Sequence, residues 1–102
     1  GPVKAIIRVH SEEEALAVAN DSEYGLSAAV YSRDSARAWN VAQRLHTGIC
    51  HINGPTVHDE AQMPFGGCKA SGYGRFGGRA GIAEFTELRW ITIQTQPREL
   101  PF

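Results

Sequence analysis

Cys50 and Cys68 are the side chains of this sequence best suited to covalent chemistry, because a cysteine thiolate attacks carbonyl carbons readily. Cys68 is followed by Lys69 in a glycine-rich stretch, and a neighbouring cation favours the thiolate form. Cys50 lies in an apolar run, where a free cysteine usually acts as a small, inert hydrophobic residue. The sequence assigns neither thiol a base or an orienting group, so both are kept as candidates only.

A cluster of six glycines lies between residues 66 and 78, and the segment 72–77 (GYGRFG) matches the dinucleotide-binding pattern G-x-G-x-x-G. That pattern binds phosphate where a strand precedes it and a helix opens on it, and residues 54–71 do not read as that strand. A Walker pattern fails as well, because Tyr73 stands where a lysine is required. We interpret the glycines as permitting tight backbone turns.

Three histidines, His46, His51 and His58, have a spacing that matches no metal-binding pattern. The two cysteines form no short-spaced pair, so a zinc ribbon is not predicted either. We expect no metal site, and we expect each imidazole to lie on the surface or in a loop.

The first half of the chain predicts elements that alternate between strand and helix. The β-branched run 3–9 (VKAIIRV) indicates a buried strand. Ser11 followed by Glu14 has the spacing of a capping box and predicts a helix start, with Gly25 as the helix end. A second strand is expected over residues 26–31.

A second helix is predicted to begin at Asp34 and to end at Gly48, and a third strand to span 49–53. The apolar residues of this helix have the i, i+3, i+4, i+7 spacing of one helical face: Ala38, Val41, Ala42 and Leu45. The resulting β-α-β-α-β order predicts an α/β fold with a partial parallel sheet. Such a sheet has open edges, which other chain segments or other copies of the chain must cover.

The second half of the chain reads differently. Residues 54–64 form a polar loop, a short helix is expected over 79–85, and residues 88–95 (LRWITIQT) alternate as a strand does. The tail beyond this strand is expected to be extended.

The bulk composition is that of one small domain: 102 residues, 42% hydrophobic and 21% charged, with a formal net charge of -1. Because no basic excess is present, nucleic acid is not an expected partner, and no apolar run approaches the ~18–20 residues that cross a membrane. Two cysteines without a disulfide pattern fit a reducing cytoplasm. The chain starts Gly1-Pro2-Val3 without an initiator methionine, so we expect a fragment or a processed chain.

Residues 64–75 (PFGGCKASGYGR) resemble the PFGG-x-K-x-SG-x-G-R signature near the C-terminus of aldehyde dehydrogenases. Further pieces follow the family's order over essentially the whole chain: GPV at 1–3, AN at 19–20, YGL at 24–26, Gly48 with Asn53, and TE at 86–87. The resemblance implies that residues 1–87 are the C-terminal part of the family's catalytic domain. It also implies that residues 88–102 are an oligomerisation strand and tail, with Arg89 in place of the usual lysine.

The resemblance implies a parent enzyme that uses NAD or NADP. In the family a cysteine thiolate attacks the aldehyde, hydride passes to nicotinamide, and a glutamate-activated water hydrolyses the thioester. None of these residues matches a position here, and neither Cys50 nor Cys68 occupies the family's nucleophile position. We expect no cofactor bound by this chain in the family's way, because the family's cofactor-contacting Glu and Phe would fall immediately before Gly1.

The segments 51–60 and 77–94 look most like the aromatic-aldehyde branch of the family, the vanillin and salicylaldehyde dehydrogenases. The resemblance implies that Phe65 lines the substrate tunnel and that Val57, His58 and Asp59 lie at the tunnel mouth. An aromatic wall suits a small aromatic aldehyde through ring stacking. Plain core packing is the alternative for Phe65.

Three functions remain open. The chain is part of an aldehyde dehydrogenase that oxidises an aromatic aldehyde such as salicylaldehyde to the carboxylic acid. Alternatively it is a self-associating structural module, a homo-oligomer formed through the 88–95 strand and the open sheet edges. A third hypothesis is a residual enzyme that uses Cys68 or Cys50. The enzyme part and the residual enzyme differ in whether activity needs upstream sequence. The self-associating module is tested by the mass of the chain in solution.

Overall fold

The first helix of the computed structural model, which describes residues 2–101, begins where the sequence predicts. Helix α1 (Glu12–Asn20) is capped by Ser11, whose Oγ accepts a hydrogen bond from the Glu14 N–H at 3.1 Å. The Glu14 carboxylate reaches back to the His10 N–H at 2.8 Å, one residue before the cap. The predicted helix end at Gly25 is wrong, because α1 stops at Asn20.

Asn20 explains the early stop. Its side-chain amide donates to the Arg44 carbonyl and accepts from the His46 N–H, both at 2.8 Å. The end of α1 is therefore fastened to the end of helix α2 (Ser35–Arg44), and the chain must leave the helix there.

The parallel sheet forms as predicted, with two strands. Strands β2 (Ser27–Val30) and β3 (Ile49–Ile52) pair in parallel, and α2 crosses between them. Asp34 caps α2 as predicted, with its carboxylate accepting from the Arg37 N–H at 3.0 Å. Ala38 of α2 is completely buried, and Leu16 of α1 is the other buried hydrophobic residue of the described part.

A second, antiparallel pair was not predicted. Strand β1 (Tyr24–Gly25) pairs with β4 (Cys68–Lys69), and the Ser71 hydroxyl accepts from the Gly25 N–H at 2.9 Å. Each strand has two residues, too few for an alternating pattern. This pair fastens the glycine-rich stretch to the first half of the chain.

Two predicted strands are wrong for the single chain. The segment 3–9 carries no strand, and Val3 and Ile6 are 86% and 96% exposed. The segment 88–95 likewise carries none, and Trp90 is 90% exposed. Within residues 2–101 no other segment pairs with them, and a strand exists only where a neighbour accepts its hydrogen bonds.

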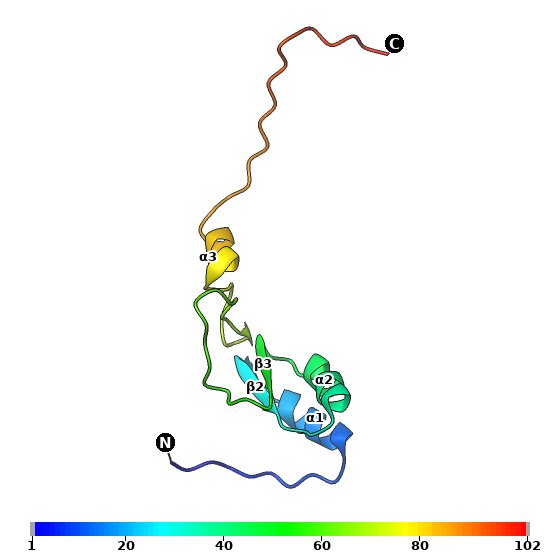
Figure 1. The fold of residues 1–102 in the computed structure, drawn as a ribbon, viewed down its shortest axis with the longest axis vertical. Coiled ribbons are helices and arrows are strands. Elements are labelled where there is room, and N and C mark those ends of the chain that lie inside the picture. Colours follow the sequence, from blue (N-terminus) through cyan, green and yellow to red (C-terminus); the bar gives the residue numbers. More distant parts are fainter. Residues whose placement is uncertain (1, 102) are drawn as a thin grey trace.

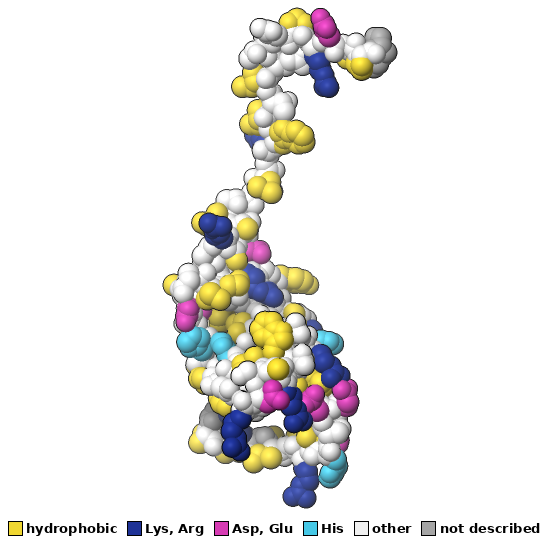
Figure 2. Space-filling model, turned by 45° about the vertical axis from the view of Figure 1, so that its right-hand side comes forward, with side chains coloured by type: hydrophobic (Ala, Val, Ile, Leu, Met, Phe, Trp, Pro, Cys, Tyr) yellow, Lys and Arg dark blue, Asp and Glu magenta, His cyan; other side chains and the backbone are white. Residues whose placement is uncertain are grey.

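The molecule therefore consists of a body, residues 10–85, and two arms, residues 2–9 and 86–101, which run out in different directions (Figure 1). The predicted helix over 79–85 forms as α3 (Gly78–Glu84) at the end of the body. Hydrophobic side chains lie open along the body and the C-terminal arm (Figure 2). No helix within 2–101 has the length and apolarity to span a membrane.

Two ion pairs join α1 to α2. Glu12 contacts Arg37 at 2.6 Å, and Glu13 accepts two hydrogen bonds from Arg44. The hydrogen bonds from Arg44 hold the pKa of the Glu13 carboxyl below its ordinary value. Both pairs lie at the surface, where solvent and salt weaken the attraction between the charges.

Candidate functional site

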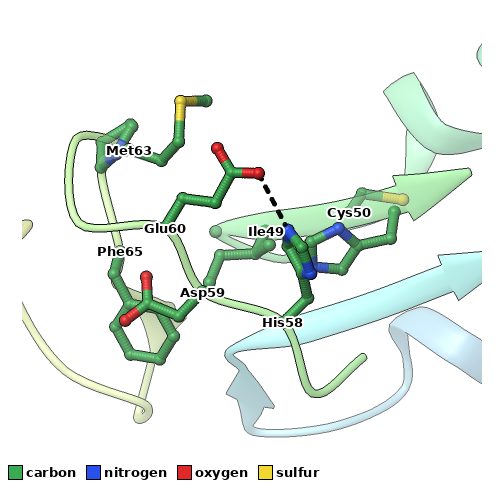
Figure 3. Close-up of a pocket in the computed structure, with 10 residues that line it drawn as sticks. Ile49, Cys50, His58, Asp59, Glu60, Met63 and Phe65 are labelled. Carbon is green, nitrogen blue, oxygen red and sulfur yellow. Dashed lines mark hydrogen bonds and ion pairs between the residues drawn. The ribbon is translucent and has the colours of Figure 1, made fainter. Parts of the chain in front are cut away.

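The loop 54–65 encloses a hollow of about 350 Å³ against strand β3. This volume lies within the ~300–1,000 Å³ typical of small-molecule sites. Figure 3 shows Ile49 and Cys50 on the strand and His58, Asp59, Glu60, Met63 and Phe65 on the loop. Gly48, His51 and Pro64 complete the lining.

Phe65 is held in the hollow by its backbone. Its N–H and carbonyl exchange hydrogen bonds with those of Phe76, each at 2.8 Å. Between these two residues the chain makes a turn that Arg75 braces, because its guanidinium donates to the carbonyls of Gly67 and Gly74 at 2.7 Å each. The turn therefore fixes the half-buried aromatic ring in the wall.

Close backbone approaches explain why this turn is rich in glycine. A Cβ added at Gly48 would collide with the Gly66 carbonyl, where the end of the α2–β3 connection touches the turn. Gly77 has a φ of 92°, a left-handed conformation that side chains disfavour. The interpretation of the glycine cluster at 66–78 as turn residues is confirmed at Gly77, whereas the predicted helix end at Gly48 is wrong, because α2 stops at Arg44.

In the structure a carboxylate lies beside the segment 72–77, which matches the phosphate-binding pattern. The Arg75 N–H donates to Glu84 Oε1 at 3.3 Å, and the same carboxylate lies against Gly74. A negative charge next to the backbone amides repels a phosphate. This turn does not fit a dinucleotide.

His58 has a defined orientation at the hollow. Its Nε2 lies 3.2 Å from Glu60 Oε1, while Glu60 Oε2 accepts from the Gln62 side chain at 2.7 Å. Both oxygens of the Glu60 carboxylate are therefore engaged. The His58 side chain stays about half exposed, 51%, and so is open to a ligand.

His51 lies beneath His58 on strand β3. The two rings meet edge-on, with centroids 5.4 Å apart and planes at 78°. His51 Nε2 is shielded from solvent and has no hydrogen-bond partner within residues 2–101. Because roughly nine in ten buried polar atoms are paired, and an unpaired one costs about 1–3 kcal/mol, this ring marks an unusual spot in the wall.

The surroundings of Cys50 favour the thiol. Cys50 is among the residues that line the hollow, and its partial burial raises the pKa of the thiol. A raised pKa leaves the group protonated at neutral pH, which is unfavourable for a nucleophile. This agrees with the interpretation of Cys50 as a small hydrophobic residue.

Cys68 lies outside the hollow, on β4. Its Sγ donates to the carbonyls of His46 and Gly25 at 3.2 and 3.5 Å. Both contacts are to acceptors that cannot take a proton at neutral pH. Neither hydrogen-bond partner that residues 2–101 give this cysteine can therefore act as its base.

Three of the four predicted tunnel residues come together in the hollow: Phe65, His58 and Asp59. Val57 does not line it and is 90% exposed. The sequence reading missed His51, whose neighbours are apolar and whose spacing from His58 carries no motif. Within residues 2–101 no group of three potential ligands is arranged to hold a metal ion.

Comparison with known proteins shows which family this sequence resembles. The sequence model of the aldehyde dehydrogenase family matches residues 1–91. A vanillin dehydrogenase from Pseudomonas sp. (strain HR199 / DSM 7063) is 65% identical over 101 residues, covering 99% of this chain and 21% of the relative. The chain thus spans about a fifth of the length of the curated relatives it matches.

Two solved structures share the fold. The crystal structure of a salicylaldehyde dehydrogenase from Pseudomonas putida G7, complexed with salicylaldehyde, matches with a TM-score of 0.91 and 53% identity, covering 100% of this chain and 21% of that one. A Mycobacterium tuberculosis aldehyde dehydrogenase complexed with NAD+ matches with a TM-score of 0.79 and 42% identity, over 85% of this chain and 18% of that one.

Proposed function

The chain belongs to the aldehyde dehydrogenase family, and we propose that it supplies one wall of the substrate pocket in an enzyme that oxidises aromatic aldehydes to carboxylic acids. The observation that carries this proposal is the hollow between β3 and the loop 54–65, with Phe65 fixed in its wall. An aromatic ring in that position gives a planar substrate a face to stack on, a contact worth about 0.5–1.5 kcal/mol beyond burial.

The names of the relatives support an aromatic substrate. The match with the salicylaldehyde-bound structure extends over the whole of this chain, and the matched vanillin dehydrogenase is also named for an aromatic aldehyde. Salicylaldehyde and vanillin are both small enough for a site of this size. Of the predicted tunnel residues, Phe65, His58 and Asp59 are the contacts we propose, and Val57 stands at the rim.

The chemical step on the aldehyde requires groups from elsewhere in the enzyme. Burial raises the pKa of the Cys50 thiol, and the Cys68 thiol donates to two backbone carbonyls. We therefore assign the role of pocket wall to this chain and the nucleophile to the remaining part of the enzyme.

The cofactor of the enzyme is NAD or NADP. When bound, it accepts hydride from the substrate carbon. The glycine turn of this chain does not fit the dinucleotide, because the Glu84 carboxylate takes the Arg75 N–H. The NAD+ complex of the matched M. tuberculosis enzyme supports NAD for the family, and the binding residues would lie outside this chain.

The C-terminal arm has a separate role in this proposal. Residues 1–87 belong to the catalytic domain, and residues 88–102 to a strand and tail that join a second copy of the enzyme. The exposed apolar residues of the C-terminal arm, Trp90 at 90% and Ile93 at 84%, support a partner sheet for this segment.

The test is a chimeric enzyme, in which this chain replaces the matching fifth of the Pseudomonas sp. HR199 vanillin dehydrogenase. We expect oxidation of vanillin, salicylaldehyde or benzaldehyde, read as reduced cofactor. Phe65→Ala should lower kcat/KM for the aromatic aldehydes about tenfold and for a short aliphatic aldehyde much less. Phe76→Ala and Phe85→Ala are matched controls outside the hollow. Equal losses on both substrates with Phe65→Ala would assign Phe65 to core packing.

The second candidate, a self-associating module without activity, is favoured by the exposed apolar arms. It predicts a defined oligomer of the chain by itself at micromolar concentration, measured by light scattering. A stable monomer would remove this candidate.

A further inference from the structure

The polar side of the hollow carries a group that the proposed reaction does not use. His58 faces the space enclosed by β3 and the loop, across the hollow from Phe65 (Figure 3). The proposed function assigns the nucleophile and the water-activating base to other parts of the enzyme, so the chemical step gives this histidine no role. The position of this ring calls for a different role.

The hydrogen bond to Glu60 defines which nitrogen of His58 is available. A carboxylate accepts only, so Nε2 carries the hydrogen and donates to Glu60 Oε1 at 3.2 Å. When the imidazole carries one proton and that proton is on Nε2, the acceptor lone pair is on Nδ1. Within residues 2–101 the contact with Glu60 is the one hydrogen bond the ring makes.

The surrounding charges determine what such an acceptor binds. Asp59 and Glu60, both in the lining, place negative charge at the hollow. Negative charge disfavours a phenolate or a carboxylate on the ligand and favours an O–H donor. The His51 ring packs edge-on against the His58 ring on the strand side.

We propose that His58 Nδ1 accepts a hydrogen bond from a ring hydroxyl of the substrate, so that the enzyme selects hydroxylated aromatic aldehydes over unsubstituted ones. This inference rests on the proposed function and specifies the substrate class of the same site. Glu60 is the positioning residue, because it fixes the tautomer and the orientation of the imidazole. Phe65 contacts the face of the substrate's aromatic ring, and His58 binds the hydroxyl substituent on that ring.

The experiment measures kcat/KM of the chimeric enzyme for 2-, 3- and 4-hydroxybenzaldehyde, each divided by the value for benzaldehyde. With His58→Phe we expect this ratio to fall about tenfold for at least one isomer. His58→Gln, whose amide oxygen also accepts, should keep most of the ratio. Glu60→Gln should lower the ratio about threefold. His10→Phe, the matched change outside the hollow, should leave it unchanged.

The outcomes separate the two proposals. If the chimera oxidises benzaldehyde and His58→Phe changes no ratio, the hydroxyl role of His58 is overturned and the proposed function stands. If the folded chimera oxidises no aldehyde, the proposed function is overturned. Should His58→Phe not fold, a lower ratio in Glu60→Gln with His58→Gln close to the original value supports the role of His58, and an unchanged ratio in Glu60→Gln overturns it.

Discussion

Strand β3 and the N-terminal arm have similar compositions and different structures. Both are short runs of apolar, β-branched residues, yet residues 49–52 form a strand and residues 3–9 do not. Strand β3 has β2 beside it, at a register that α2 enforces through its crossover. The arm has no neighbour within 2–101, so its apolar side chains stay exposed. Composition thus indicates which segments are able to be strands, and the available partners decide which of them become strands.

The difference between body and arms bears on the high TM-score with the salicylaldehyde dehydrogenase. The match with the salicylaldehyde dehydrogenase covers 100% of this chain, arms included, although about four-fifths of that enzyme has no counterpart here. The arms therefore lie where a larger protein would hold them. The body is fixed by its own hydrogen bonds, whereas the apolar side chains of the arms stay exposed within residues 2–101.

The largest effect is expected from a change in the body. Gly48→Ala in the chimera should destabilise the protein by more than ~3 kcal/mol, because the new Cβ would collide with the Gly66 backbone. Gly54→Ala is the control, since its nearest neighbour, His51 Cβ, would lie 3.7 Å away. The measurement is the urea midpoint of each variant. Equal midpoints would mean that the turn is not packed as described.

The next effect tests the arm. In the chimera we expect the rest of the enzyme to cover the N-terminal arm. Ile6→Asp should then lower the free energy of unfolding by about 2–4 kcal/mol, because a buried charge without a partner is unfavourable. Lys4→Gln, a polar-to-polar change in the same arm, should cost almost nothing. Thermal unfolding of both variants gives the comparison. If Ile6→Asp unfolds at the original temperature, the arm is exposed in the complete enzyme too. The expectation that other parts of the enzyme cover the arm would then be wrong.

A smaller effect is expected at the junction of the two helices. Asn20→Ala removes the bonds to the Arg44 carbonyl and the His46 N–H and should cost about 1–2 kcal/mol. Asn40→Ala, on the exposed face of α2, should be neutral or slightly stabilising, because alanine is the better helix former. Urea unfolding measures both. A loss in Asn40→Ala as large as that in Asn20→Ala would contradict the cross-link.

The smallest effect belongs to the surface ion pair. Because Arg44 lowers the pKa of Glu13 in the folded state, the pair stabilises above the ordinary carboxyl value of 4.5 and this contribution is lost as the pH falls through the folded value. The melting temperatures of the chimera and its Glu13→Gln variant should therefore differ slightly at pH 7 and converge in acid. Added salt should also reduce the difference. A gap that widens in acid would reverse the assigned sign.

How much the sequence predicts depends on the range of the interaction. Ser11 and Asp34 were correct as caps, because a cap bonds within three residues of itself. The β1–β4 pair was missed, because Gly25 and Cys68 are far apart in sequence and carry no pattern. Phe65 was found through the family motif, whereas His51 was missed because only the fold brings its ring against His58.

The most direct test of the substrate wall is a crystal structure of the chimera with 4-hydroxybenzaldehyde or salicylaldehyde bound. We expect the aromatic ring of the ligand between β3 and the loop 54–65, with carbon atoms within about 4 Å of Phe65. A ligand bound with its ring outside this hollow, and Phe65 packed only against protein, would contradict the central claim.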